Sequence, residues 1–420
     1  MSSAFQPVIV VHYHEVWLKG GNRHFFISKL VAALRTALAG AAQPRFSKPG
    51  DRLLIELGPG ADVAECVRRI ERVFGIANFA VARPVVKSLD AICAAAWDEV
   101  APLDFSTFAV RAKRSDKSFP LNATAIERHV GGFVMQKLRA AGRDVRVQLN
   151  TPGVTCRVEI TSGPALVYAR RLPGPGGLPP NTAGKMLCLL SGGFDSAVAA
   201  WKMMKRGAHL AFAHFYSTGA KPGESSMHVA RALVEKLAPW QGSAALHLIP
   251  FDPIQREVYA RAPEQHRILL YRRLMLRIAE RIALRTKARA LVTGDSLGQV
   301  ASQTLPNMAA VGAVARLPLF RPLVGDDKQE ILDLARRIGT YDISAEPFHD
   351  CCPVFMPAAP ALFASATDLD AAESSLDLDS LIRAAIASTL RERYELISGH
   401  VERVEKVTVG AGLPRPLQQA

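Results

Sequence analysis

The alternation of strands and helices after residue 185 constrains the fold of this chain more than any other feature. Apolar β-rich segments and helical patterns follow one another there, at residues 186–190, 196–205, 209–215, 225–237, 244–249, 268–285 and 288–293. Such alternation is typical of a parallel sheet whose crossover helices cover both faces. We therefore expect a doubly wound α/β domain over residues 186–390.

The chain before residue 172 has a different pattern. Short strands are mixed there with helical patterns at 25–39 and 125–140, which predicts small α+β units. Residues 172–184 hold four prolines and four glycines, a composition that continues neither a helix nor a central strand. We interpret this segment as an interdomain linker. The expected limits are 1–60 and 61–172 for two N-terminal domains, 173–185 for the linker and 391–420 for a helical tail.

The charge balance points to a polyanionic partner. The chain has 52 Lys and Arg against 38 Asp and Glu, a formal net charge of +14. This excess favours a nucleic acid over the alternative of a generally basic protein. Four arginines recur every fourth residue along the helix expected at 268–285. We interpret this stripe as a solvated helix face rather than an RNA contact; its members are Arg273, Arg277, Arg281 and Arg285.

The cysteines and the N-terminus bear on metal sites and compartment. Of six cysteines only Cys351 and Cys352 are close in sequence, so no CxxC pair supports a zinc ribbon or a ferredoxin-type cluster. We see no signal peptide and no apolar stretch of membrane-spanning length. We therefore expect a cytoplasmic protein with reduced thiols.

The segment SGGFDS, residues 191–196, is the most specific motif. It lies between an apolar strand and an Ala-rich helix, where two glycines let backbone N–H groups approach an anion. The helix N-terminus adds a partial positive charge. Ser191 and Ser196 can donate hydroxyls to phosphate, and Asp195 can hold a magnesium ion or orient the phosphates. The alternative is an ordinary glycine-rich turn with Ser196 as a helix cap.

Several segments together resemble a known family. SGGxDS resembles the PP-loop of ATP pyrophosphatases, which cleave ATP between the α- and β-phosphates, and the segment lacks the Walker A pattern. The wider set closely resembles the tRNA 4-thiouridine synthetases, or tRNA sulfurtransferases, in the form without a rhodanese domain. It comprises HEVWLKGGNRHFF from residue 14, RAKRSDKSFP from 111, ALVTGDSLGQVASQTL from 290 and RPLVGDDKQEI from 321.

The resemblance implies a fold and an activity. The fold is an N-terminal ferredoxin-like domain, a THUMP domain that holds tRNA, and a PP-loop domain of the adenine nucleotide α-hydrolase-like type. The activity is adenylation of a tRNA uridine with ATP and Mg²⁺, followed by replacement of its 4-oxygen with sulfur to give 4-thiouridine. Implied partners are tRNA, a persulfide donor such as a cysteine desulfurase, a sulfur-carrier protein for thiamine synthesis and a second copy of the chain.

The resemblance and the motifs together give three sets of site residues. The expected catalytic residues are Asp195, Lys328, Cys351 and Cys352. The expected ATP-binding residues are Leu189, Leu190, Ser191, Gly192, Gly193, Phe194, Ser196, His214, Phe215, Arg272, Gly294 and Gln303. The expected tRNA-binding residues are Lys19, Arg23, Arg111, Lys113, Arg114 and Lys117.

Some of these assignments have structural alternatives. Lys328 could instead form an ion pair with Asp326 or Glu330. Cys351 and Cys352 could be incidental thiols rather than persulfide carriers. Two other functions remain open at the level of the sequence: an amide-forming PP-loop ligase, and a tRNA-binding protein with an inactive ATP site. Because we see no room for a rhodanese domain, we expect an external sulfur donor.

Overall fold

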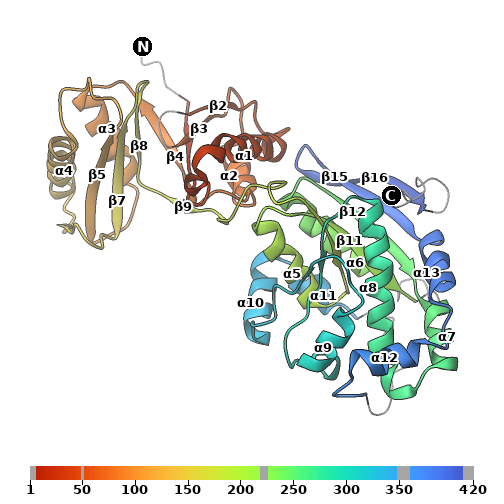
Figure 1. The fold of residues 1–420 in the computed structure, drawn as a ribbon. Helices are drawn as coiled ribbons and strands as arrows, with labels where there is room; N and C mark the ends of the chain where they lie inside the picture. The colour runs from red at the N-terminus through yellow and green to blue at the C-terminus, as the bar shows by residue number, and fades with distance from the viewer. Residues whose placement is uncertain (1–5, 49–51, 218–225, 348–359, 410–420) are drawn as a thin grey trace. The chain divides into compact units, whose positions relative to one another are not determined.

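The chain forms two compact units, which divide between Leu178 and Pro179 within the segment expected to be the linker. The computed structural model describes residues 6–48, 52–217, 226–347 and 360–409 (Figure 1). Each unit is built on its own sheet.

A nine-stranded sheet organises the first unit, in the order β2-β3-β1-β4-β8-β7-β5-β6, with β9 paired to β4. The strands are β1 (Val8–His12), β2 (Arg45–Ser47), β3 (Leu53–Glu56), β4 (Asn78–Val85), β5 (Thr107–Arg114), β6 (Arg146–Val147), β7 (Val154–Ile160), β8 (Ala165–Tyr168) and β9 (Leu172–Pro173). The helices are η1 (Trp17–Asn22), α1 (Arg23–Leu38), α2 (Val63–Ile70), α3 (Leu89–Val100) and α4 (Ala123–Ala140).

Strand β4 belongs to both halves of this sheet. Its residues 78–82 pair with β1, whereas its residues 83–85 pair with β8. One apolar core packs α1 and α2 against β1 and β3, and a second packs α3 and α4 against β5, β7 and β8. The first core includes Cys66, Ile70 and Phe79. Helix α2 therefore packs with the first half, beyond the expected domain limit at residue 60.

The second unit is built on a seven-stranded sheet in the order β14-β13-β10-β11-β12-β15-β16. The strands are β10 (Lys185–Leu189), β11 (His209–Tyr216), β12 (Ser243–Pro250), β13 (Leu291–Val292), β14 (Leu319–Phe320), β15 (Leu390–Ile397) and β16 (His400–Thr408). The strands from β14 to β12 are parallel, and β15 and β16 continue the sheet antiparallel.

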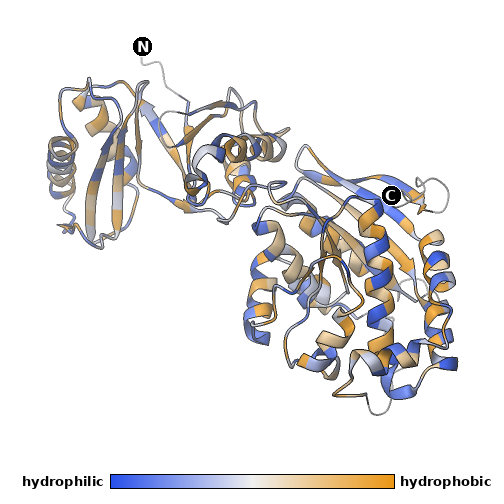
Figure 2. Ribbon diagram, in the orientation of Figure 1, coloured by the Kyte–Doolittle hydropathy of each residue, from blue (hydrophilic) through white to orange (hydrophobic). Residues whose placement is uncertain are grey.

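Helices cover both faces of the second sheet, as the alternation in the sequence predicts (Figure 1). They are α5 (Phe194–Lys205), α6 (Met227–Leu237), η2 (Ala238–Trp240), α7 (Asp252–Arg261), η3 (Glu264–His266), α8 (Arg267–Arg285), η4 (Ala301–Gln303), α9 (Leu305–Gly312), α10 (Lys328–Ile338), α11 (Tyr341–Ala345), α12 (Ala366–Glu373) and α13 (Leu378–Ala387). The largest core packs α7, α8, α12 and α13 against the sheet. Apolar and polar residues alternate along α8, as expected of a helix with one buried face (Figure 2).

The expected helical tail at 391–420 is wrong for its described part, which forms the hairpin β15–β16. Ile397 pairs with His400, so the connection has two residues, Ser398 at φ 50° and Gly399 at φ 91°. Positive φ at both central positions is the type I′ geometry, whose twist matches that of the flanking strands. The Ser-Gly dipeptide was the turn signal in the sequence.

The arginine stripe of α8 is solvated only toward its C-terminal end, where Arg281 and Arg285 are exposed, and the expected solvated face is wrong for Arg273 and Arg277. Arg273 is 1% exposed and pairs with Glu373 at 3.1 Å. Arg277 pairs with the same carboxylate at 2.6 Å, and Arg281 pairs with Asp379 at 2.7 Å. The expectation failed because the acidic partners lie about a hundred residues later, on α12 and α13.

Candidate active site

The glycine-rich loop joins β10 to α5 and is braced by its own hydroxyls. The backbone N–H of Ser191 donates to Ser196 Oγ at 3.1 Å, and the N–H of Gly193 donates to Ser191 Oγ at 3.2 Å. Gly193 is the N-cap of α5, and no side chain caps the helix there. Ser196 lies inside the helix and is buried, and its hydroxyl supports the loop through bonds to the backbone of Ser191. The helix dipole nevertheless favours an anion at this end.

Gly294, which follows β13, packs directly on the first turn of α5. A Cβ on Gly294 would lie 2.7 Å from the backbone nitrogen of Ser196 and 2.8 Å from the carbonyl carbon of Asp195. Both distances are shorter than real Cβ contacts, so only glycine permits this approach. The contact fixes the end of β13 against the glycine-rich loop of residues 191–196 (the phosphate-type loop).

Asp195, in the first turn of α5, holds two polar side chains from distant segments. Lys328 Nζ donates to Asp195 Oδ1 at 2.7 Å, and Gln299 Nε2 donates to Oδ2 at 3.1 Å. Lys328 is the first residue of α10, and Asp327 and Glu330 form a capping box there. Lys328 is therefore directed to the loop, not to Asp326 or Glu330.

A buried carboxylate, Asp295, lies next to this pair at the end of β13. Arg272 from α8 pairs with Asp295, Thr293 Oγ1 donates to it at 2.8 Å, and Arg321 Nε lies 3.2 Å away. Burial opposes the charged form, but Arg272, Thr293 and Arg321 outweigh it and lower the pKa of Asp295. Arg272 also donates to Ser302 at 3.0 Å, so its guanidinium is fixed in position.

Several of these residues line a cavity of about 220 Å³. Its lining includes eight of the expected ATP-binding residues together with Asp195: Leu189, Leu190, Ser191, Ser196, Phe215, Arg272, Gly294 and Gln303. The other four belong to the loop or its support: Gly192, Gly193, Phe194 and His214. His214 is buried, with Nδ1 2.8 Å from the Leu190 carbonyl and Nε2 2.8 Å from Ser226 Oγ, so it holds the loop from behind.

Asp295 also lines the cavity, and the sequence prediction omitted it. The signal was its place directly after a strand of the parallel sheet, because ligands bind outside the carboxyl ends of such strands. Thr293, Ala213 and Met275 complete the lining. The cavity thus combines an apolar floor from the strands with a polar rim.

The described cysteines are unsuited to sulfur transfer. Cys66, Cys93, Cys156 and Cys188 are all buried. Burial raises the pKa of each thiol, that of Cys156 and Cys188 to about 12. The thiolate is the reactive form, so these four sulfurs are inert near neutral pH. Cys351 and Cys352 lie outside the described residues.

The cations expected to bind tRNA all lie in the first unit. Arg23 stacks on Trp17, with its guanidinium carbon 3.8 Å from the ring centroid, and Lys19 lies 5.3 Å from the Phe26 ring. Lys113 and Lys117 are exposed.

Two of these cations, both arginines on β5, donate to backbone carbonyls of the protein itself. Arg111 Nη2 donates to the Leu149 carbonyl at 2.5 Å. Arg114 is part-buried and donates to the carbonyls of Phe119 at 3.0 Å and Leu121 at 3.1 Å, so it also orders the loop after β5.

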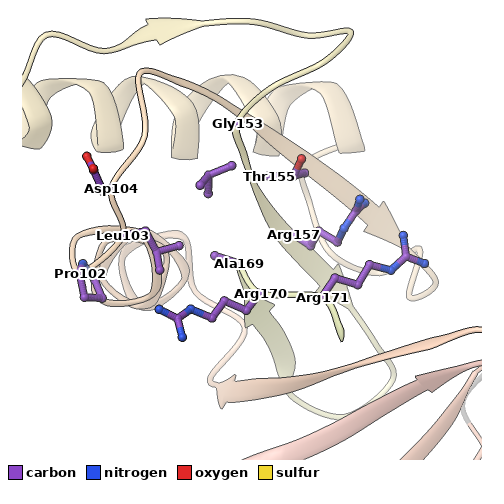
Figure 3. Close-up of a pocket in the computed structure, with 10 residues that line it drawn as sticks. Pro102, Leu103, Asp104, Gly153, Thr155, Arg157, Ala169, Arg170 and Arg171 are labelled. Carbon is purple, nitrogen blue, oxygen red and sulfur yellow. The ribbon is translucent and has the colours of Figure 1, made fainter. Parts of the chain in front are cut away.

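A larger cavity of about 490 Å³ lies in the same unit, between the loop after α3 and strands β7 and β8 (Figure 3). Arg157, Arg170 and Arg171 line it, and Asp104 lies at its other side (Figure 3). Burial and the neighbouring cations Arg171 and Arg111 lower the pKa of Arg157. These arginines escaped the sequence analysis because they are scattered along the chain. The dibasic Arg170–Arg171 pair after a strand was the available signal.

The described residues contain no group of three or more His, Cys, Asp or Glu side chains placed to hold a metal ion. At the phosphate-type loop a single carboxylate, Asp195, is available, which is the donor type that Mg²⁺ uses alongside phosphate oxygens. No helix in the described part of the chain is long and apolar enough to cross a membrane.

Comparison with known proteins assigns the family. Three family models match in order: the ThiI ferredoxin-like domain at residues 8–80, the THUMP domain at 87–170, and the thiamine biosynthesis protein ThiI at 181–378. A probable tRNA sulfurtransferase of Thermus thermophilus is 42% identical over 93% of this chain and 93% of its own length. Another, from Moorella thermoacetica, is 40% identical over 89% and 94%.

A solved structure agrees with these matches. The crystal structure of a 4-thiouridine synthetase–RNA complex with bound ATP superposes with a TM-score of 0.83 and 31% identity, covering 92% of this chain and 99% of that chain. The expected fold of ferredoxin-like, THUMP and PP-loop domains is confirmed. The chain belongs to the tRNA sulfurtransferase family.

Proposed function

We propose that this chain is an ATP-dependent tRNA sulfurtransferase that adenylates a tRNA uridine and replaces its 4-oxygen with sulfur, giving 4-thiouridine. The observation that carries the proposal is the Asp195–Lys328 pair beside a self-braced phosphate-type loop, in a chain 42% identical to a probable tRNA sulfurtransferase. A tRNA-binding protein with an inactive ATP site gives no reason for Asp195 and Arg272 to line one cavity while Lys328 is held on Asp195.

ATP occupies the cavity of the second unit in this proposal. The loop amides and the α5 N-terminus hold the phosphates, and the apolar strand ends contact the adenine. Attack by the uridine O4 on the α-phosphorus releases pyrophosphate and leaves AMP on O4. Lys328 and Arg272 supply positive charge where negative charge develops in this step. Asp195 keeps Lys328 at the loop.

Asp195 would hold a magnesium ion together with the phosphate oxygens of ATP, and the ion would supply positive charge against the phosphates. Lys328 and Gln299 each donate to one oxygen of Asp195 and so fix the orientation of the carboxylate.

The tRNA is held through its phosphates by the cations of the first unit. Lys19, Arg23, Arg111, Lys113 and Lys117 contact the backbone, and the arginine-lined cavity of Figure 3 accepts a further phosphate. We also propose that the enzyme acts in the cytoplasm as a homodimer. A sulfur-carrier protein for thiamine synthesis is a second acceptor, in keeping with the match to the ThiI model.

Sulfur reaches the uridine as a persulfide on Cys351 or Cys352, loaded by an external donor such as a cysteine desulfurase. Its terminal sulfur attacks C4 of the adenylated base, and AMP leaves with the oxygen. The neighbouring thiolate then attacks the inner sulfur, so that the two cysteines form a disulfide, the first sulfur–sulfur bond breaks and the outer sulfur stays on C4. A dithiol reductant returns the disulfide to two thiols by giving up two electrons. The four described cysteines are excluded as carriers by their burial and their raised pKa values.

The test is tRNA-dependent exchange of pyrophosphate into ATP, combined with mass spectrometry of the nucleosides after incubation with desulfurase, cysteine and Mg²⁺. We expect exchange only when tRNA is present, and 4-thiouridine in the digest. Exchange driven by a small carboxylate without tRNA would instead establish an amide-forming ligase. Tight tRNA binding without exchange would establish an inactive ATP site.

A further inference from the structure

A second cavity of about 220 Å³ lies at the N-terminal ends of strands β10 and β11, whereas the cavity proposed to bind ATP lies at their C-terminal ends. Lys185 at the start of β10 and His209 at the start of β11 line it, whereas Leu189 at the end of β10 lines the first cavity. At a rise of about 3.3 Å per residue, roughly 13 Å of strand separates Lys185 from Leu189. The two cavities are therefore distinct.

Small residues on the central strands create the space. Ala211 of β11 and Ala245 of β12 are part of the lining. On β15, Arg393 stands opposite Ala245 and Arg391 stands opposite His247. Alternate residues of a strand share a face, so these side chains project from the same face of the sheet. Glu405 of β16, which faces Arg393 in the register, completes this wall.

His247 is a buried polar side chain that the protein itself does not satisfy. It is 1% exposed, and among the described residues neither Nδ1 nor Nε2 has a hydrogen-bond partner. His209 Nδ1 is also buried and has no hydrogen-bond partner among the described residues. Buried polar atoms are nearly always bonded, so three such nitrogens at one cavity indicate a bound molecule.

The charge of the cavity favours an anion. Lys185, Arg391 and Arg393 line it with only one carboxylate, Glu405, which pairs with Arg391 at 2.5 Å. Glu395, outside the lining, pairs with Arg393. Three cations thus stand against two carboxylates, and a positive charge is left over.

Both imidazoles are neutral near pH 7. Burial and Lys185 lower the pKa of His209 to about 4, and burial and Arg391 lower the pKa of His247 to about 4. A neutral imidazole offers one N–H donor and one acceptor nitrogen. The cavity therefore presents cations and N–H donors to a ligand that carries several oxygens, at least one of them protonated or part of a hydroxyl.

We propose that this cavity binds a small phosphorylated anion, either inorganic phosphate or a short phosphate monoester. The phosphate oxygens accept hydrogen bonds from Lys185, from Arg391 or Arg393, and from the N–H of His247. A hydroxyl of the ligand donates to the other ring nitrogen of His247. The volume equals that of roughly seven waters at about 30 Å³ each, so it admits a phosphate with a small attached group. The site is independent of the sulfurtransferase proposal, because it uses none of the residues of the first cavity.

The test must separate this site from the PP-loop, which also attracts phosphate. Phosphate and ribose 5-phosphate are titrated by calorimetry into the whole protein saturated with α,β-methylene-ATP, which occupies the first cavity. The variants are His247→Leu and Lys185→Ala. The matched control is Arg289→Ala, which removes an exposed cation next to the lining residue Ala288.

We expect saturable binding to the parent and to the control, and binding weakened about tenfold or more in both variants, the loss that one charge-assisted hydrogen bond produces. Tighter binding of ribose 5-phosphate assigns a monoester, and tighter binding of phosphate assigns the free ion. Equal affinity in His247→Leu and the parent overturns the proposal, as does the absence of saturable binding to the parent.

A second measurement keeps the proposal testable if a variant fails to fold. The ring nitrogens of His247 are followed by ¹H–¹⁵N NMR in the parent protein during the phosphate titration. A ring nitrogen that enters a hydrogen bond with the ligand changes its chemical shift. Ring signals of His247 that stay constant while phosphate binds elsewhere contradict the proposal.

Discussion

Lys328 Nζ lies 2.7 Å from Asp195 Oδ1, although 133 residues separate the two in the chain. Each residue belongs to the first turn of a helix, α10 and α5, and the two helices pack against each other. The pair therefore joins the N-terminus of α10 to the first turn of α5, directly after the glycine-rich loop. Lysine and carboxylate set each other's position, so the loss of either alters the charge at the loop as well as its geometry.

We predict that Asp195→Ala lowers adenylation by about 10²-fold or more, the usual cost of removing a fixed charged group from an active site. Binding of tRNA should be unchanged, because the cations expected to contact tRNA lie in the first unit. The measurements are tRNA-dependent ATP–pyrophosphate exchange and filter binding. Asp333→Ala removes an exposed carboxylate from α10 and serves as the control. Exchange at the parental rate in Asp195→Ala would remove the residue from the mechanism.

We predict that Asp295→Asn destabilises the fold by up to about 3–5 kcal/mol, because it leaves two part-buried cations without their counter-charge. Asp295 is 5% exposed between Arg272 and Arg321. Urea unfolding measures the loss. The control is Asp326→Asn, which removes a more exposed partner of Lys202 and should cost no more than about 1 kcal/mol. Similar losses in both variants would show that Asp295 does not hold the arginines.

We predict that Arg111→Glu with Lys113→Glu weakens tRNA binding and flattens its salt dependence. Each lost phosphate contact lowers the slope of log K against log salt by about 0.7 to 0.9. Affinity is measured over a salt series, with Lys137→Glu on α4 as a control of equal charge change per residue. A parental slope in the double variant would make this part of β5 a solvated surface.

We predict that acid weakens the fold between about pH 6.5 and pH 4 in part through His209 and His247. Their folded pKa values of about 4 lie below the unfolded value near 6.5, so the unfolded chain binds protons first as the pH falls. The contribution of the two neutral histidines to the free energy of unfolding is complete above pH 6.5 and is lost as the pH falls toward 4. His247→Leu should make urea unfolding less sensitive to pH in this window. The exposed His400→Ala is the control, and a parental profile in His247→Leu would contradict the assignment.

We predict that Cys351→Ser or Cys352→Ser abolishes thiolation with desulfurase, ATP and tRNA while pyrophosphate exchange continues. Exchange reports adenylation, which needs no sulfur. Cys188→Ser is the matched control, since its buried thiol has a pKa raised to about 12 and no part in transfer. If both single variants and the double variant thiolate at the parental rate, free sulfide reaches the base directly.

Local sequence patterns were sufficient for the parallel core and the loop, because both depend on neighbours in the chain. The run from β10 through α5 is such a case: an apolar strand, two glycines and a helix, all within twenty-one residues. Its bounds in the structure differ by one or two residues from those expected. Of the eight expected ATP-binding residues that line the cavity, four belong to this run. Phe215 and Gly294 lie at or just after strand ends, whereas Arg272 lies on α8 and Gln303 in η4, beyond what the alternation alone predicts.

Pairings between distant segments were not readable in the sequence. The partner of Lys328 was sought among its neighbours Asp326 and Glu330, yet it is Asp195. The partners of Arg273 lie on α12, so the first arginine of a stripe that is polar in sequence is buried in the fold. A charge pattern gives the composition of a helix face, whereas its burial depends on a helix that arrives later in the chain.

The sharing of β4 between two halves of one sheet has a mechanical consequence. Its residues 78–82 bond to β1 and its residues 83–85 bond to β8, and one apolar cluster joins Val10 of β1 to Leu166 of β8 across this junction, so bending there would open the cluster. Arg52 and Glu159, an ion pair that links β7 to the residue preceding β3, resist the same bending. We therefore expect the two halves of the first unit to move as one body. Cations on η1 and on β5 keep a fixed spacing, and an RNA can engage both only if its own backbone matches that length.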